Sequence, residues 1–252
     1  MGKSPYCIAM AGKGGTGKTT VAGLLVKYLV EKGKVPVLAV DADANANLNE
    51  VLGLTVRETL GEAREEMKKG VASGMTKDVF MEMKLEQAVV EAEGYDLVVM
   101  GRPEGPGCYC AANTLLTTYL DRLMGNYAYV VMDNEAGMEH ISRMTTNNMH
   151  ALLVVSDSSR RGIQAAARIF QLVEEISLRI GRKLLIVNQA QDAERSMIDA
   201  TAKEFGLEVT GMIPEDHQVR EYDRTGKPMI ELDGHNKAVQ AAYRIFEGIF
   251  EG

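Results

Sequence analysis

Residues 12–20 of this chain are Gly12-Lys13-Gly14-Gly15-Thr16-Gly17-Lys18-Thr19-Thr20. They fit the pattern G-x-x-x-x-G-K-[ST], and they lie between an apolar run, Tyr6–Met10, and a segment with helical spacing of apolar residues. Glycines in such a loop let backbone N–H groups converge on phosphate oxygens at the start of a helix. We expect Lys18 to reach the outer phosphates and the Thr19 hydroxyl to bind Mg²⁺. A glycine-rich turn without a ligand is the alternative, and the strand–loop–helix setting disfavours it.

The rest of the chain alternates short β-rich runs with longer helical patterns, which is typical of a parallel sheet built from right-handed crossovers. With 252 residues and 46% hydrophobic content, the chain can bury one large core. We therefore predict an α/β fold, a single-domain three-layer P-loop NTPase over residues 1–252, with a mainly parallel central sheet of about seven or eight strands. Strands are expected near 5–10, 36–41, 95–100, 127–132, 151–155, 184–188 and 209–213. Helices are expected near 17–32, 76–92, 111–124, 138–148, 160–180, 193–205 and 234–250.

The net charge and the hydropathy of the chain indicate whether it binds nucleic acid or membrane. A net charge of −7 disfavours nonspecific nucleic-acid binding, which depends on Lys and Arg. No run of about 18 or more apolar residues occurs, and MGKSPY lacks the apolar core of a signal peptide, so we expect a cytoplasmic protein that does not bind membrane. The C-terminal segment 238–250 is predicted to pack on the core, because its late charges are acidic rather than basic. Residues 53–78, rich in Glu, Lys and Gly, are expected to be exposed or mobile.

Two predicted strands end in carboxylates. Asp41 and Asp43 end the second strand, where open α/β sheets bind ligands, and their spacing places both on one side of an extended chain. Solvated strand-end residues or helix caps are the alternative for this pair. The apolar run before Asp133 has the Walker B arrangement, so Asp133 is expected to hold Mg²⁺ through water. Residues 134–137 then form a candidate switch, in which Gly137 allows movement.

Two of the three cysteines are one residue apart, in Gly105-Pro106-Gly107-Cys108-Tyr109-Cys110. In an extended backbone both sulfurs can point the same way, but two thiolates do not complete a tetrahedral metal site. A symmetric dimer would supply the missing pair and give a site of four cysteines. Buried, unreactive thiols are the alternative. Cys7, in the first strand, is expected to be a small core residue.

The sequence GKGGTGKTT, with its second lysine, resembles the deviant phosphate loop of the dimeric ATPases that include MinD, ParA, the nitrogenase iron protein and the nickel-inserting ATPases. The resemblance implies that Lys13 reaches the partner's nucleotide in a nucleotide-gated homodimer. It also implies that Asp43 orients the attacking water and that Asp41 supports the Mg²⁺ shell. The ligand is then ATP or ADP, with base contacts from Asn188 and from a loop containing Ile213, Pro214 and Asp216. Several relatives have a Lys after Asn188, which this chain lacks.

Cys108-Tyr109-Cys110 and the run Asp133–Arg143 resemble the CooC-type nickel-inserting ATPases of carbon monoxide dehydrogenase. This resemblance implies an ATP-hydrolysing metallochaperone that carries Ni²⁺ or Zn²⁺ between subunits. Its client would be carbon monoxide dehydrogenase or acetyl-CoA synthase. His140 in this run is predicted to be a cap or surface group rather than a ligand.

Two other functions stay open. One is an iron–sulfur redox ATPase like the nitrogenase iron protein, although residues 134–143 contain no Cys for a cluster. The other is a positioning ATPase of the MinD or ParA kind, which the acidic charge disfavours.

Overall fold

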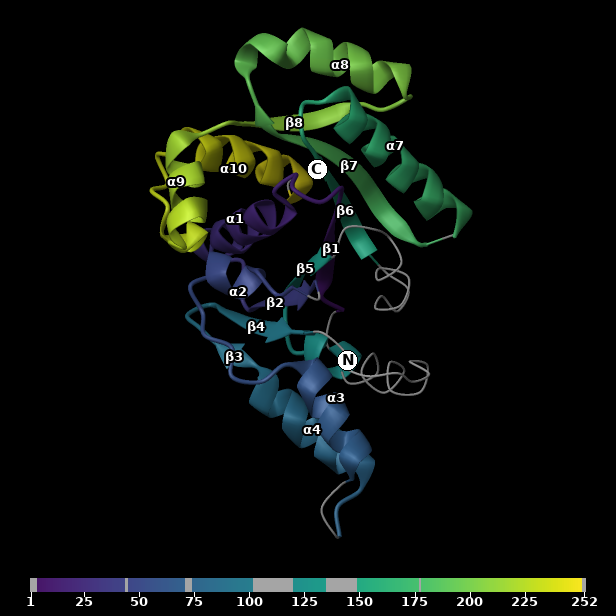
Figure 1. Cartoon of the computed structure of the whole chain (residues 1–252), viewed down its shortest axis with the longest axis vertical. Helices are drawn as coiled ribbons and strands as arrows, with labels where there is room; N and C mark the ends of the chain where they lie inside the picture. The colour runs from purple at the N-terminus through teal and green to yellow at the C-terminus, as the bar shows by residue number, and fades with distance from the viewer. Residues whose placement is uncertain are drawn as a thin grey trace.

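The described residues form an eight-stranded sheet with helices packed on both of its faces (Figure 1). This computed structural model describes residues 4–43, 45–70, 74–101, 120–134, 149–176 and 178–250. The strand order is β3-β4-β2-β5-β1-β6-β7-β8, and every neighbouring pair is parallel except β3 with β4. The strands are β1 (Tyr6–Ala11), β2 (Val37–Ala42), β3 (Val90–Glu91), β4 (Tyr95–Val99), β5 (Tyr129–Asn134), β6 (Met149–Ser156), β7 (Ile180–Ala190) and β8 (Val209–Pro214).

The helices form two layers around this sheet. The α-helices are α1 (Lys18–Glu31), α2 (Leu48–Val51), α3 (Leu60–Lys69), α4 (Lys77–Ala88), α7 (Arg160–Glu175), α8 (Arg195–Glu204), α9 (His217–Thr225) and α10 (Lys237–Phe250). The described residues also contain two 3₁₀ turns, η1 (Asp192–Glu194) and η2 (Met229–Glu231), and a helical stretch at residues 120–124. Figure 1 shows α1 next to α10, and the α3–α4 pair at the opposite end of the molecule from α8. No described helix is both long and apolar enough to span a bilayer.

The core consists of one apolar cluster on each face of the sheet. In β1, Ile8 and Met10 join the cluster with α1 and α10, whereas Ala9 and Ala11 join the cluster with α7 and α8. This alternation follows from the two-residue period of a strand, and it explains why the strand sequences are apolar throughout.

The strand order brings three chain segments together at one edge of the sheet. Strand β5 lies between β2 and β1, so the residue that ends β5 is a neighbour both of the end of β2 and of the loop after β1. Because these strands are parallel, their carboxyl ends all meet at the same edge. The fold therefore places the two predicted carboxylate segments beside the glycine-rich loop.

The predicted α/β architecture with a mainly parallel sheet is confirmed, and all seven expected strands are present. The eighth strand, β3, was missed because it lies inside the predicted helix 76–92, which ends at Ala88. The predicted helix 160–180 is also too long: α7 ends at Glu175, and β7 begins at Ile180 instead of 184. The prediction missed the start of β7 because Gly181, Arg182 and Lys183 interrupt the apolar run that marks a buried strand.

Two segments are more ordered than the sequence indicated. The stretch 53–78 was expected to be exposed or mobile, but it contains α3, which begins with a capping box between Thr59 and Glu62 and buries Leu60, Ala63 and Met67. Helix α9 was not predicted, although Asp216 caps its start and Gly226 ends it in the left-handed conformation.

The predicted C-terminal helix is confirmed as α10, and its apolar face packs on the core. The predicted helix 138–148 lies outside the described residues.

Candidate functional site

The glycine-rich loop connects β1 to α1 at the carboxyl edge of the sheet. Gly12 has φ +148°, and a Cβ there would lie 2.2 Å from the Val155 carbonyl oxygen of β6. Gly17 has φ +83°, and a Cβ there would lie 2.3 Å from Nδ2 of Asn188. Both positions therefore require glycine, because neighbouring strands close off the space and L side chains rarely adopt these angles.

Hydrogen bonds fix the shape of this loop from inside. The Thr16 hydroxyl donates to the Lys13 carbonyl oxygen at 2.9 Å, and Nδ2 of Asn188 donates to the Thr16 carbonyl oxygen at the same distance. Thr16 and Asn188 are both buried. Asn188 was expected to face the base of a nucleotide, and its amide nitrogen is bonded to the loop. Through this amide nitrogen, Asn188 links β7 to the glycine-rich loop.

The first turn of α1 presents Lys18, Thr19 and Thr20. Gly17 is the N-cap residue and provides no side-chain cap, and the first turn contains no acidic residue. The backbone N–H groups at this helix start therefore remain available for an anion, and the helix dipole favours negative charge there. Lys18 is only 8% exposed and contributes to the cavity above the loop. Lys13, in contrast, is exposed.

Asp133 is the last residue but one of β5, lies next to Thr19 and is buried. The Thr19 hydroxyl is close enough to the Asp133 carboxylate to lower its pKa, and Oδ1 of Asp133 has no hydrogen-bond partner among the described residues. Burial raises the pKa of Asp133 to about 7, with a further contribution from Asp41, against the opposing effects of Thr19 and Lys18. A buried oxygen without a partner beside a hydroxyl is a donor set that suits Mg²⁺.

Asp41, at the end of β2, organises the loop that follows it. Its Oδ1 accepts from the backbone N–H of Asp43 at 3.0 Å, and its Oδ2 accepts from that of Leu48 at 2.9 Å. Burial raises the pKa of Asp41 to about 6, although these two N–H donors oppose the rise. Asp41 therefore holds the loop into α2 while lying beside Asp133.

Asp43 does not continue the strand, because β2 ends at Ala42. We predicted that Asp41 and Asp43 would share one side of an extended chain, but the loop turns at this point. Oδ1 of Asp43 accepts from the Asn45 backbone N–H at 2.8 Å, and Asp43 borders the cavity, whereas Asp41 is fully buried. The two carboxylates thus have different surroundings, one in the cavity and one inside the fold.

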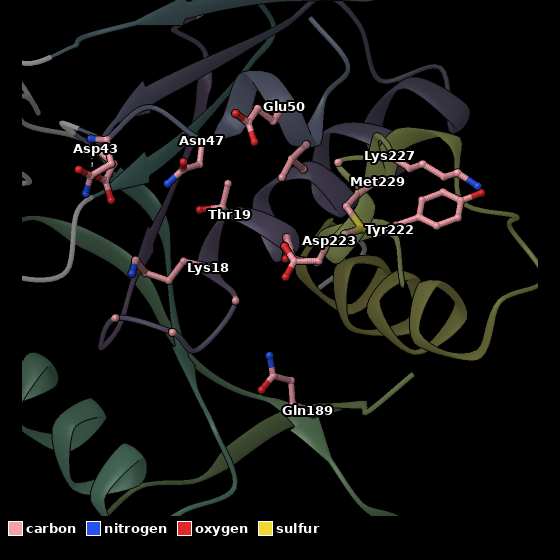
Figure 2. Close-up of a pocket in the computed structure, with 17 residues that line it drawn as sticks. Lys18, Thr19, Asp43, Asn47, Glu50, Gln189, Tyr222, Asp223, Lys227 and Met229 are labelled. Atoms are coloured by element: carbon pink, nitrogen blue, oxygen red, sulfur yellow. Dashed lines mark hydrogen bonds between the residues drawn. The ribbon is translucent and has the colours of Figure 1, made fainter. Parts of the chain in front are cut away.

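These segments enclose a cavity of about 480 Å³, here termed the main cavity (Figure 2). Figure 2 shows Lys18 and Asp43 at one end, and Tyr222, Asp223, Lys227 and Met229 at the other. A nucleotide whose phosphates contact the loop would therefore extend its nucleoside toward α9 and η2. The main cavity is lined by Gly14, Gly15, Gly17, Lys18, Thr19, Thr20, Asp43, Asn45, Asn47, Glu50, Val51, Gln189, Tyr222, Asp223, Gly226, Lys227 and Met229.

A narrow slot of about 60 Å³ adjoins the main cavity and is lined by the predicted base-side residues Asn188, Ile213, Pro214 and Asp216. Ile213 is buried and supplies an apolar wall. Asp216 caps α9 by accepting from the backbone N–H groups of Gln218 and Val219. Burial alone would raise the pKa of Asp216, but the hydrogen bonds from Asn236 and these N–H groups lower it. All four predicted residues thus lie at one slot beside the phosphate loop.

Several lining residues were not predicted, and they come from elements that the sequence interpretation lacked. Glu50 lies in α2, and Asn47 is the residue that precedes this helix. Tyr222 and Asp223 lie in α9. The Asp216 and Gly226 caps were the sequence signal for α9. Gln189, which has φ +56°, had no sequence signal.

The proposed metal ligands Cys108 and Cys110 lie outside the described residues, as do Gly137 and His140. Within the described part of the chain, no three His, Cys, Asp or Glu side chains form a metal-binding group. Cys7 has a free thiol that is half-buried in β1 and contacts the Pro5 carbonyl oxygen. Burial raises its pKa to about 11, which agrees with a structural role.

Comparisons with known proteins agree with this geometry. The model of the CobQ/CobB/MinD/ParA nucleotide-binding domain matches residues 7–229. An uncharacterized ATP-binding protein of Methanocaldococcus jannaschii is 41% identical over 247 residues, covering 96% of this chain and 97% of that protein. The carbon monoxide dehydrogenase accessory protein CooC of Rhodospirillum rubrum is 30% identical over 245 residues, covering 89% of each. The septum site-determining protein MinD of Pyrococcus horikoshii, solved with Mg-ADP, has the same fold, with a TM-score of 0.71, 24% identity and coverage of 98% and 96%.

Proposed function

Because this chain belongs to the CobQ/CobB/MinD/ParA family of nucleotide-binding domains, we propose that it is an ATPase that carries nickel to carbon monoxide dehydrogenase or the allied acetyl-CoA synthase. The observation that carries the proposal is the 30% identity to CooC over 89% of both chains. The pair Cys108 and Cys110 within this chain supports it, because two soft thiolates are suitable ligands for nickel or zinc.

The main cavity supports ATP binding and hydrolysis. Loop N–H groups and Lys18 would hold the phosphates, and Asp43 would position the attacking water at the outer phosphate. The water oxygen forms a bond to the terminal phosphorus while the bond from that phosphorus to the bridging oxygen breaks, which gives ADP and phosphate. Thr19 and Asp133 would hold Mg²⁺, with Asp41 behind them. The ion supplies charge stabilisation for the phosphoryl group.

Lys13 supports a nucleotide-gated homodimer. It is exposed on the phosphate loop, whereas Lys18 of the same loop is buried toward the main cavity. An exposed lysine beside a phosphate site is free to contact the nucleotide of a second copy. In this proposal ATP joins two chains, each Lys13 neutralises charge across the interface, and hydrolysis removes the contact that holds the subunits together.

Nickel is cargo in this proposal. One chain supplies two thiolates, and the second supplies the other two when ATP closes the dimer, which gives four ligands around one ion. Separation of the subunits after hydrolysis leaves the ion with half of its ligands. The ion can then pass to a client that offers more ligands. Zinc competes for the same thiolates, since ligand type alone does not exclude it.

Metal binding by cysteine variants tests this function. Replacing Cys108 and Cys110 together by Ser should abolish tight nickel and zinc binding while ATP hydrolysis continues, because the thiolates are separate from the phosphate site. Cys7→Ser is the matched control, and it should bind metal like the unchanged protein. Full metal binding by the double variant would refute the proposal. A visible absorption band typical of an iron–sulfur cluster in anaerobically purified protein would instead favour a redox ATPase.

A further inference from the structure

One wall of the main cavity is formed by a short segment that cannot be stable alone. Gly226, Lys227 and Met229 line the cavity, and the segment continues into η2, a single 3₁₀ turn. Within η2, the Glu231 N–H donates to the Pro228 carbonyl oxygen and the Leu232 N–H to that of Met229, both at 3.1 Å. Two such bonds do not hold a turn in place, so its position depends on contacts with the rest of the fold.

Lys27 of α1 provides such a contact. Its Nζ donates to the Ile230 carbonyl oxygen at 2.8 Å, and Lys27 is only 8% exposed. Lysine is rarely buried to this extent without partners, because removing an ammonium group from water is costly. The second partner is Glu31, one turn later in α1, at 2.7 Å.

Glu31 is in turn held by a second hydrogen bond, from Tyr243. The Tyr243 hydroxyl of α10 donates to Oε2 of Glu31 at 2.6 Å, while Oε1 of Glu31 bonds to Lys27. The pKa of Glu31 is lowered: burial opposes the shift, but the Lys27 and Tyr243 hydrogen bonds prevail. Glu31 is therefore a fixed carboxylate partner for the Lys27 ammonium, which also donates to the Ile230 carbonyl oxygen of η2.

The start of the segment is held by a close contact between Gly53 and the Pro228 ring. Gly53 has φ +70°, and a Cβ there would lie 2.8 Å from Cγ of Pro228. The loop after α2 thus presses on Pro228, and Lys27 holds the next turn against α1. Without the Lys27 bond, the Ile230 carbonyl oxygen would lose its charged donor, and η2 would be held by the buried Met229 and Leu232 side chains and by the Pro228 contact alone.

We propose that Lys27 is a positioning residue for the nucleoside half of the bound nucleotide. Helix α1 receives the phosphates at its first turn, and through Lys27 it also fixes the wall that contains Lys227 and Met229. The position of the phosphate end and that of the nucleoside end are thereby set by the same helix. This inference rests on the proposed binding of ATP in the main cavity, and it assigns Lys27 no contact with the ligand.

Calorimetric titration of Lys27→Met with Mg-ATP and with Mg-tripolyphosphate tests the proposal. Met keeps the aliphatic stem but removes the donor, so ATP should bind about tenfold more weakly, as expected when a charged hydrogen bond is lost. Tripolyphosphate, which has no nucleoside, should bind with unchanged affinity. Lys27→Arg should restore ATP binding. Lys32→Met, which removes an exposed lysine paired with Glu247, is the matched control and should leave both affinities unchanged.

Amide hydrogen exchange in the nucleotide-free protein tests the anchoring itself. The N–H groups of Glu231 and Leu232 should exchange at least several-fold faster in Lys27→Met than in Lys32→Met. Unchanged exchange at both amides, or an equal loss of ATP and tripolyphosphate binding, would overturn the inference. A wild-type protein that binds tripolyphosphate but not ATP would refute the proposed function, and the exchange rates would still decide the role of Lys27.

Discussion

Asp41 and Asp133 are register partners on the adjacent parallel strands β2 and β5, and both side chains are buried. Burial makes the charged form of each carboxylate costly, and at Asp133 the charge of Asp41 adds to that cost. The pKa of each is raised, to about 6 for Asp41 and about 7 for Asp133. The protein keeps this unfavourable pair beside Thr19, which indicates that the site is built to receive positive charge.

Asp133→Asn should therefore stabilise the nucleotide-free protein and abolish Mg²⁺-dependent nucleotide binding. Above pH 7 the folded state bears the cost of a charged, buried carboxylate, so the free energy of unfolding should rise by up to about 4 kcal/mol in the variant. Denaturant unfolding with and without Mg-ADP measures both effects.

The pH dependence provides the control for this prediction. The pKa of Asp133 is higher in the folded than in the unfolded state, so the folded state binds the extra proton between about pH 4 and pH 7. Stability due to this group is lost as the pH rises through that range. The difference between variant and wild type should therefore vanish near pH 4. A difference that does not depend on pH would show that charge is not its cause.

Gly12→Ala should destabilise the protein and prevent nucleotide binding. The added Cβ would lie 2.2 Å from the Val155 carbonyl oxygen, so strands β1 and β6 would have to separate, at a cost of about 2 kcal/mol or more. Thermal unfolding and ATP titration measure the outcome. Gly14→Ala is the matched variant, because a Cβ at Gly14 meets no described atom within 4 Å and the glycine has no positive φ. Equal destabilisation by both substitutions would contradict the close contact.

Lys13→Gln should abolish ATP-dependent dimerisation and reduce hydrolysis to background, while ATP binding to the single chain remains measurable. The exposed position of Lys13 outside the main cavity is the reason for this separation of effects. Lys18→Gln should instead lose binding itself, because Lys18 lines the cavity. Sedimentation and phosphate release are the measurements. Wild-type turnover by Lys13→Gln would reject the contact across subunits.

Asp216→Ala should lower the free energy of unfolding by about 1 kcal/mol at pH 7, as expected for an N-cap. The carboxylate accepts from Gln218 and Val219 N–H groups, and its pKa is lowered in the folded state. The stabilisation is therefore present above the unfolded-state pKa of Asp and is lost as the pH falls through the lower, folded-state pKa. Urea titrations at several pH values below pH 5 check this sign. A difference in the free energy of unfolding between Asp216→Ala and the unchanged protein that grows as the pH falls would contradict the capping role.

The sequence was sufficient to predict the sheet and the phosphate loop because both depend on local patterns. Seven apolar runs became strands, and GKGGTGKTT became a loop between β1 and α1. The short strand β3 was not predictable in the same way, since Val90 and Glu91 join the sheet only by pairing with β4. Tertiary pairing determined that segment more than local propensity did.

The sequence indicated which polar and charged side chains lie near the phosphate loop, but it did not indicate the long-range hydrogen bonds that hold the site together. The motif indicated Lys18, Thr19 and Asp133 correctly as neighbours, because parallel strands end at one edge. The bond from Asn188 to the Thr16 carbonyl oxygen and the bond from Lys27 to that of Ile230 join residues more than a hundred positions apart. No local pattern encodes such pairs, since they arise from the packing of β7 and η2.

In the proposed function, two chains joined by ATP share one metal ion. The most direct test is to load anaerobic protein with nickel and a nonhydrolysable ATP analogue, measure its mass by light scattering, and determine its metal content by elemental analysis. We predict a dimer containing one nickel ion per two chains. No such dimer should form without nucleotide, and none should form from Lys13→Gln with the ATP analogue present. A chain that remains monomeric with every nucleotide, or a dimer with a full nickel ion on each chain, would contradict it.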